Sequence, residues 1–380
     1  MPTPPPTTFY KKRLTLASDI PFFGRAWALI FSSTQSNPGA PDIIISSDAF
    51  EPEALRVTFD INQYAFSAFW HAEITIFNAN GGITAGPSKG VNLTKAVISE
   101  GDTITLMAGY QADYPDIPPP IIWQGQIFYT LQDRDNVVDQ RLIIHSLVSR
   151  ALTTQNFINA TAPAFLSQFE QARYIADNSV NKIQMNPQQI QSALSAAPIK
   201  RGAANLPRAK TYFGPPHQYL QKLAEQANCL SWFDAHHWQA DSLQKPTGEL
   251  VGTYAPVNLL GGPPQKIGKV SLSLIGQPQQ TQQGVTFRIL LDPKVQVLAP
   301  LPLVSLQKQY IRQAPIPYPL PPDTFIAIPL SEDDTYVVVG VRFIGDTRGN
   351  AWYTDVIGAT QIQTVVSLLG QFLDADHSAN

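Results

Sequence analysis

The sequence predicts a mainly β protein in which two antiparallel β domains flank a mixed α+β middle segment. Alternation of apolar and polar residues recurs before residue 152, which is typical of half-buried strands. Helical spacing of apolar residues replaces this alternation between 164 and 228, and the alternation returns after residue 270. Because strands joined by short turns favour a barrel or a sandwich, we expect an antiparallel β domain toward each end of the chain.

The first predicted β domain covers residues 20–152 and follows a proline-rich arm over residues 1–19. The prolines of MPTPPPTTFYKKR favour an extended chain, because proline cannot enter a helix beyond its first turn. In LRVTFDI, every second position from Leu55 to Ile61 is apolar and the positions between are polar. The strands expected in this domain are 25–33, 41–47, 55–61, 72–78, 102–110, 121–132 and 140–148.

The middle domain is predicted over residues 153–255. Apolar faces at helical spacing predict helices over 164–177 and 215–228, formed by Phe165, Leu166, Phe169, Ala172 and Ala176 and by Tyr219, Leu220, Leu223, Ala224 and Ala227. Pro216 suits the first turn of the second helix and Asn228 its end. Residues 229–243 resemble a short hairpin, and the Gln- and Asn-rich part, 178–198, is expected to be irregular.

The second predicted β domain covers residues 256–360, and a helical tail over 361–380 follows it. The strands expected here are 270–276, 284–292, 295–307, 333–345 and 350–359, with a proline-rich loop at 314–322. The tail carries an apolar stripe at helical spacing, formed by Ile362, Val365, Val366, Leu369 and Phe372. A lone short helix cannot bury such a stripe, so we expect it to dock on a partner.

The composition argues against several classes of protein. A net charge of −3 gives no electrostatic attraction for nucleic acid. One cysteine, Cys229, excludes an internal disulfide framework and any multi-cysteine metal site.

No apolar run reaches the ~20 residues that span a bilayer, so we expect no membrane anchor. Prolines stand where a signal peptide would carry its apolar core, which favours synthesis in a cytoplasm without secretion. Only 14% of the residues are charged, which is typical of a protein whose surface is covered by partners.

No pattern in the chain predicts catalysis, a metal or a cofactor. His236 and His237 are adjacent, and neighbouring residues on a strand point to opposite faces, so one metal site is not expected to use both. Cys229 lacks a catalytic signature around it and is expected to pack as a small apolar group. No GxSxG, Walker or GxGxxG motif is present. We therefore expect a protein that is not an enzyme.

The segment GDTRGN is the most distinctive polar turn of the chain. It contains Gly345, Asp346, Arg348, Gly349 and Asn350, between an apolar run and an aromatic pair. It is too short for a phosphate loop and lacks the Lys-Ser/Thr pair. We interpret it as a hairpin turn whose glycines allow positive φ and whose Asp and Arg cap or pair across the turn. A specific contact with a partner is the alternative.

The ordered segments GRAWALIF, LRVTFDI, AEITIFN, GDTITLMAGY, IIWQGQI, YFGPPHQYLQKLAEQ, SLIGQPQQTQQGVTFRILLDPKVQV and GDTRGNAWYT resemble the baseplate hub proteins of contractile-tailed bacteriophages. The resemblance runs from about residue 24 to 360. It implies two tube-type β-barrels flanking the middle domain. It further implies a homotrimer that adapts the sixfold tail tube to a threefold central spike.

The same resemblance implies a location and a set of partners. The hub would lie in the tail baseplate of the virion and form part of the channel for DNA ejection. Its partners would be the tail tube protein, the central spike protein, the tape measure protein and the baseplate wedge proteins, with DNA only as passing cargo. No cofactor is implied. A tail-associated cell-wall hydrolase and a type VI-like secretion spike component are the alternatives.

Overall fold

The computed structural model describes a large part of the 380-residue chain. The described residues are 24–32, 42–46, 55–65, 70–78, 98–110, 113–114, 118–134, 140–196, 205–227, 229–234, 237–242, 253–256, 266–267, 270–280, 284–302, 311–312 and 335–359. The arm over 1–19, the loop at 314–322 and the tail over 361–380 lie outside these residues.

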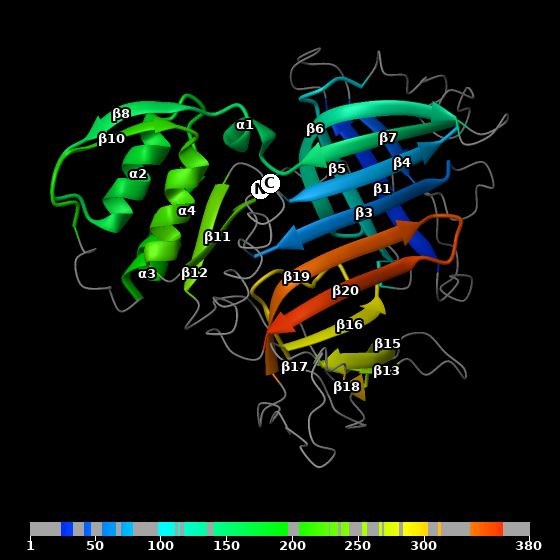
Figure 1. The fold of residues 1–380 in the computed structure, drawn as a ribbon. Helices are drawn as coiled ribbons and strands as arrows, with labels where there is room; N and C mark the ends of the chain where they lie inside the picture. The colour runs from blue at the N-terminus through cyan, green and yellow to red at the C-terminus, as the bar shows by residue number, and fades with distance from the viewer. Residues whose placement is uncertain are drawn as a thin grey trace, which may run out of the picture.

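The fold is mainly β, with one large sheet and a smaller helical unit beside it (Figure 1). The N-terminal strands of the sheet are β1 (Arg25–Ser32), β2 (Ile43–Ser46), β3 (Val57–Tyr64), β4 (His71–Phe77), β5 (Thr103–Tyr110), β6 (Ile121–Arg134) and β7 (Gln140–Leu147). The C-terminal strands are β13 (Thr253–Pro256), β14 (Lys266–Ile267), β15 (Val270–Gln280), β16 (Gly284–Leu290), β17 (Pro300–Pro302), β18 (Ile311–Arg312), β19 (Thr335–Asp346) and β20 (Trp352–Ala359). The seven strands expected near the N-terminus are all present, and every pairing among them is antiparallel.

The two halves of the sheet share one connection pattern. In the N-terminal half β3 pairs with β4, β4 with β7, β7 with β6, and β6 with β5. In the C-terminal half β15 pairs with β16, β16 with β20, β20 with β19, and β19 with β17. Five strands taken in chain order, with the two-residue β18 left aside, therefore pair in the same way twice. The last hairpin of each set also has a bulge at a comparable place, Phe128 in β6 and Val339 in β19.

The two halves meet at a seam between β3 and β19. Seven residue pairs form this antiparallel ladder, from Gly340 opposite Tyr64 to Asp346 opposite Thr58. Backbone hydrogen bonds extend it at both ends, where Ala65 N–H donates to Val339 O and Thr347 N–H donates to Val57 O, both at 2.9 Å. The strands of the two predicted β domains thus belong to one hydrogen-bonded sheet.

The path of pairings through the described strands is open. It runs from β13 through β15, β16, β20, β19, β3, β4, β7, β6, β5 and β1 to β2, with β14, β17 and β18 beside it. No closed barrel is formed by the pairings among these strands. The described residues therefore confirm a mainly β fold with a large antiparallel sheet.

The middle of the chain forms the unit at the left of Figure 1. Its elements are α1 (Arg150–Thr153), β8 (Ile158–Ala162), α2 (Gln168–Asn178), β9 (Gln184–Met185), α3 (Pro187–Ala196), β10 (Lys210–Gly214), α4 (Pro216–Gln226), β11 (Cys229–Asp234) and β12 (His237–Ser242). The helix with Pro216 in its first turn and the hairpin after Cys229 confirm their predictions. Asn228 lies outside the described residues.

Two predictions in this unit were wrong. The stretch 178–198 is not irregular, because it contains β9 and α3. Its Ile190, Ala193 and Leu194 have helical spacing and are buried, which its many glutamines obscured. Phe165 does not share the face of α2. Ser167 caps that helix, so Phe165 precedes it, with a φ of 68° and 77% of its surface exposed.

A third prediction, a strand over 295–307, was also wrong for the residues described there. Only Pro300–Pro302 is a strand, and Leu298 has a φ of 66°, which a strand does not accommodate. Leu298 instead joins the sheet edge through its backbone, where its N–H donates to Val338 O at 2.7 Å.

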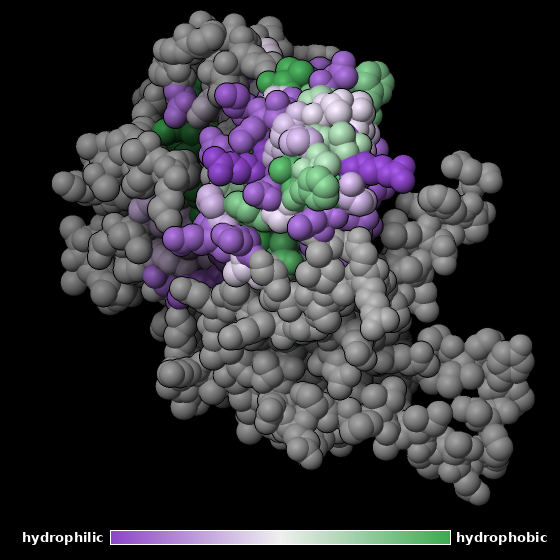
Figure 2. Space-filling view, turned by 90° about the vertical axis from the view of Figure 1, so that its left-hand side faces the viewer, coloured by the Kyte–Doolittle hydropathy of each residue, from purple (hydrophilic) through white to green (hydrophobic). Residues whose placement is uncertain are grey.

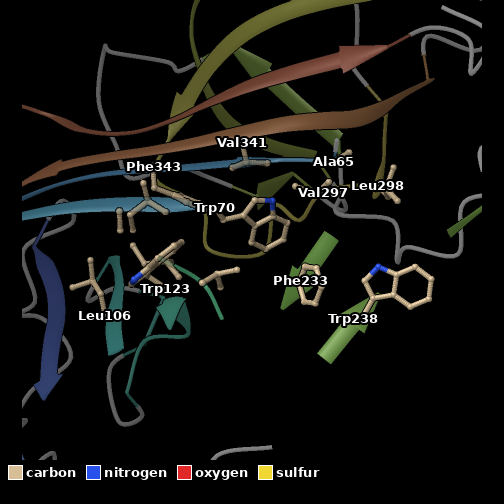
Figure 3. Close-up of a cluster of buried hydrophobic side chains, with 14 of the residues drawn as sticks. Ala65, Trp70, Leu106, Trp123, Phe233, Trp238, Val297, Leu298, Val341 and Phe343 are labelled. Atoms are coloured by element: carbon tan, nitrogen blue, oxygen red, sulfur yellow. The ribbon is translucent and has the colours of Figure 1, made fainter. Parts of the chain in front are cut away.

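A single contiguous apolar cluster joins the sheet to the middle unit. It includes Trp70, which directly precedes β4, Trp123 from β6, Phe343 from β19 and Trp238 from β12 (Figure 3). The buried indoles retain polar contacts, since Trp123 Nε1 donates to Ser146 Oγ at 3.0 Å and Trp70 Nε1 donates to Tyr64 O at 2.9 Å. Among the helices described, none is long and apolar enough to cross a membrane.

Candidate functional site

The candidate site is the turn between β19 and β20. Gly345 pairs with Trp352 at the end of the ladder, and Asp346 N–H donates to Ala351 O at 2.8 Å to close the turn. Arg348, Gly349 and Asn350 lie in the loop that follows. The five residues singled out in the sequence thus come together at one hairpin.

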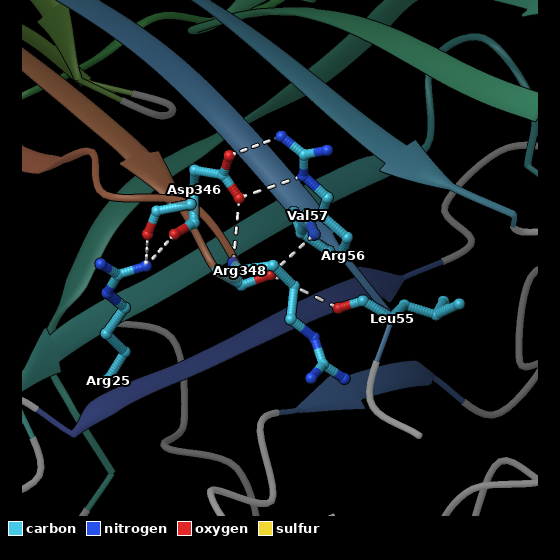
Figure 4. Close-up of polar contacts among 8 residues, drawn as sticks. Arg25, Leu55, Arg56, Val57, Asp346 and Arg348 are labelled. Carbon is cyan, nitrogen blue, oxygen red and sulfur yellow. Dashed lines mark hydrogen bonds and ion pairs between the residues drawn. The ribbon is translucent and has the colours of Figure 1, made fainter. Parts of the chain in front are cut away.

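The carboxylate of Asp346 is the polar centre of this turn (Figure 4). Arg56, at the start of β3, donates to both of its oxygens, with Nε at 3.2 Å from Oδ1 and Nη2 at 2.7 Å from Oδ2. The Arg348 N–H donates to Oδ1 at 2.9 Å. Burial raises the pKa of Asp346, but the hydrogen bonds from Arg56 and from the Arg348 and Gly349 amides outweigh burial and lower that pKa below its ordinary value.

The backbone of the turn is held by two other strands. Arg25 of β1 donates through Nη1 to Gly349 O at 2.6 Å and also to Asp346 O. On the other side, Val57 N–H donates to Thr347 Oγ1 at 2.9 Å. The turn therefore binds β1 and β3, which come from the opposite half of the sheet, and its geometry depends on both halves.

The two glycines of the turn are required by close approach and not by positive φ, which corrects the sequence-based explanation. Positive φ is found at Gly101, Gly214 and Gly276 and not at Gly345 or Gly349. A Cβ on Gly345 would lie 2.1 Å from the Phe59 ring, and one on Gly349 would lie 2.3 Å from the Asp346 carboxylate. Any larger residue would displace these neighbours.

An aromatic layer lies directly beneath the turn. Trp352 packs edge-to-face on Phe59 with the ring centroids 5.3 Å apart, and Arg25 lies over the Trp352 indole at 5.2 Å. Tyr110 donates its hydroxyl to Trp352 O at 3.3 Å, and burial raises the pKa of this Tyr110 hydroxyl, which keeps it protonated as a donor. The polar turn thus packs against a layer of aromatic side chains.

Further ion pairs cross the outer face of the sheet on neighbouring strands. Arg288 of β16 binds Asp355 of β20 with Nε at 2.6 Å from Oδ1, and Arg342 of β19 binds Asp60 of β3 with Nε at 2.8 Å from Oδ1. Asp355 lies opposite Arg288 on one side and opposite Arg342 on the other. Arginine and carboxylate therefore alternate from strand to strand across the seam.

These contacts join the β19–β20 turn to β1 and β3, so the turn is a structural junction. The Asp346 carboxylate is engaged by an arginine and backbone amides, so it is not poised as a general base. Within the described ranges, no group of three histidine, cysteine or acidic residues could hold a metal ion. Cys229 is buried and donates from Sγ to Ala193 O at 3.1 Å, as expected of a packed thiol. His236 and the side chain of His237 lie outside the described residues.

The sequence did not reveal Arg25 and Arg56 as partners of the turn. They are 321 and 290 positions away from Asp346, and no local pattern marks either residue. The predicted docking residues Ile362, Val365, Val366, Leu369 and Phe372 fall outside the described residues.

Exposed apolar side chains gather on the middle unit, whose outer face is turned toward the viewer in Figure 2. Phe157 and Phe213 form an edge-to-face pair with centroids 5.0 Å apart, and Phe213 is 66% exposed. Val180 is joined to Phe157 by a backbone hydrogen bond of 2.9 Å and is also exposed. No role for these three residues could be predicted from the sequence.

The comparisons with known proteins were informative for structure alone. No family model and no curated protein matches this sequence. The 43 kDa tail protein of prophage MuSo2 from Shewanella oneidensis superimposes with a TM-score of 0.51 at 6% identity, over 89% of this chain and 98% of that one. A tail protein from Neisseria meningitidis gives a TM-score of 0.44 at 10% identity, over 89% and 97%. A type VI secretion system component from E. coli gives 0.46 at 9% identity, over 80% and 73%.

At such identities the likeness concerns fold alone, and of these three superpositions the one with the MuSo2 tail protein exceeds a TM-score of 0.5. That superposition nevertheless covers nearly the whole of the tail protein. It agrees with the family that the ordered sequence motifs resemble. This chain therefore has the fold of a phage tail protein.

Proposed function

We propose that this chain is a structural hub of a contractile phage tail baseplate. As a homotrimer it would adapt the sixfold tail tube to the threefold central spike and form part of the channel through which DNA leaves. Each half of the sheet would then complete a tube-type barrel, with the middle domain between them. No catalytic step is assigned to the chain.

The observation that carries this proposal is the repeated five-strand pattern. One chain contains the pattern twice, so a ring of three chains would present six such units. A threefold assembly with six similar units has the symmetry needed to join a sixfold tube to a threefold spike. The fold shared with the prophage MuSo2 tail protein supports the same assignment.

The turn at 345–350 has a structural role in this proposal. Through Arg25 and Arg56 it fixes the ends of β1 and β3 against the β19–β20 hairpin, which sets the relative position of the two halves. The Arg342–Asp60 ion pair on the outer sheet face crosses the same seam and reinforces it. A ring built from paired units requires such a fixed geometry within each chain.

The C-terminal segment would contribute to assembly by docking its apolar stripe on a neighbouring subunit or on the spike. A chain truncated after Ala359, the last residue of β20, tests this idea. The truncated protein should stay folded and soluble and should assemble poorly with its partners. If it unfolds on its own, the segment packs within its own subunit.

Particle mass and symmetry test the function as a whole. Analytical ultracentrifugation and electron microscopy of the full chain, alone and with its spike and tube proteins, should show a trimer with pseudo-sixfold features on the tube side. Monomers in every mixture would refute the hub assignment. Incubation with purified cell walls should release no soluble fragments, and reproducible release would favour the hydrolase instead.

A further inference from the structure

We propose that His71 and His145 form a two-histidine site for a divalent transition-metal ion on the outer face of the sheet. His71 lies on β4 and His145 on the neighbouring strand β7, and both side chains are partly exposed. His71 Nε2 and His145 Nδ1 are 3.1 Å apart. This site is remote from the turn in the sequence and does not depend on the proposed tail function.

The separation of the two nitrogens matches the distance between two adjacent ligand atoms of one metal ion. Imidazole nitrogen binds Zn²⁺ at about 2.0–2.1 Å. With two such bonds, the 3.1 Å separation corresponds to an N–metal–N angle of about 98°. That angle lies between those of octahedral and tetrahedral coordination, so the distance between the two nitrogens suits adjacent ligands of one ion.

The backbone and a third ring hold the pair in place. In the β4–β7 ladder His71 is opposite Leu147 and His145 is opposite Glu73, which puts the two imidazoles on one face along a diagonal. The rings are nearly parallel, with an interplanar angle of 23°, and Tyr129 of β6 stacks on His145 with centroids 4.3 Å apart. The stack restricts the His145 ring, so less motion is lost when a metal binds.

The protonation of the pair is compatible with binding. In the neutral pair one ring donates an N–H to the other across the 3.1 Å contact. A metal ion needs both facing nitrogens unprotonated, so the donating ring must carry its proton on its other nitrogen. This is a change of tautomer, and the pair as a whole releases no proton. Glu73 lies opposite His145 and adds negative charge beside the site. Water would fill the remaining positions, since no third histidine, cysteine or acidic residue completes a metal-binding group here among the described residues.

Zn²⁺ titration of the tag-free full chain tests the site, with calorimetry and thermal unfolding as readouts. The wild type should bind about one Zn²⁺ here and gain stability, and Mg²⁺ should not replace it because a hard cation prefers oxygen ligands. His71→Gln and His145→Gln should each weaken binding by about tenfold or more. The matched control His236→Gln removes another imidazole of the chain and should leave this binding unchanged.

Two results would overturn the proposal. One is Zn²⁺ affinity that is equal in the wild type and in both site variants. The other comes from ¹⁵N-histidine spectra of the wild type, a measurement that needs no variant to fold. There Zn²⁺ should perturb the His71 and His145 ring nitrogens first, and perturbation confined to other histidines would place the metal elsewhere.

Discussion

At the scale of single residues, Asp346 controls the turn between β19 and β20. Its side chain is 13% exposed, whereas that of its partner Arg56 is 46% exposed. Replacing Asp346 by Asn removes the charge and weakens the bidentate contact. We expect a loss of about 1–2 kcal/mol in the free energy of unfolding at neutral pH. Chemical denaturation measures it, and Asp177→Asn, in an exposed helical pair, is the control that should change little.

The same variant has a defined pH dependence. The pKa of Asp346 is lowered in the folded state, so its contribution to stability is present above the unfolded pKa of about 4. It is lost as the pH falls through the lower folded value. The stability difference between the wild type and Asp346→Asn should therefore shrink below about pH 4. A difference that stays constant down to pH 2 would contradict the assigned ion pair.

Gly345 provides a second test at this scale. A Cβ at this position would lie 2.1 Å from the Phe59 ring, so Gly345→Ala should cost about 1–3 kcal/mol through overpacking. Phe59→Leu should relieve part of this cost by shortening the ring that the methyl meets. The double variant should then be more stable than the sum of the single changes predicts. Strict additivity in this double-mutant cycle would show that the two residues are not in contact.

At the scale of elements, the start of α2 is set by a reciprocal cap. Glu170 N–H donates to Ser167 Oγ at 3.3 Å, and Ser167 N–H donates to Glu170 Oε2 at 2.8 Å. Ser167→Ala should therefore cost about 1 kcal/mol. Ser192→Ala, in the interior of α3, is the matched control and should be neutral or stabilising because alanine favours helix. Equal effects of the two changes would argue against the cap.

Most of the strands could be predicted from the sequence, but the contacts between residues far apart in the chain could not. Alternation located β3 and β4 well because each has one buried and one open face. In β5, which is buried on both faces, Met107 joins Ala28 and Ile30 in a small second apolar cluster that alternation alone does not predict. The pairing of β3 with β19 joins residues far apart in the chain, and no local pattern encodes it.

At the candidate site the sequence identified the turn and not its anchors. Glycine, aspartate and asparagine mark a turn by their local backbone preferences, so the segment from 345 to 350 could be recognised. The need for glycine at 345 comes from the Phe59 ring on another strand, which only the folded chain reveals. Arg25 and Arg56 escaped notice for the same reason.

At the scale of the whole molecule, the two halves of the sheet should not fold independently. The seam and the contiguous apolar cluster connect them, and β19 without β3 would be an open edge with seven unpaired positions. A fragment containing residues 253–380 should therefore be poorly folded by circular dichroism and prone to aggregation. The full chain should lose the protection of β3 and β19 amides together in hydrogen exchange. A fragment that unfolds cooperatively at the temperature of the full chain would refute this coupling.

The seam between β3 and β19 also determines how the molecule responds to mechanical load. A pull along the strands acts on all seven residue pairs and on the Arg342–Asp60 and Arg56–Asp346 contacts at once, because these lie side by side along the direction of shear. A pull across the strands instead opens the pairs one after another and needs far less force. We therefore expect the seam to be mechanically anisotropic, strong along β3 and β19 and weak at right angles to them.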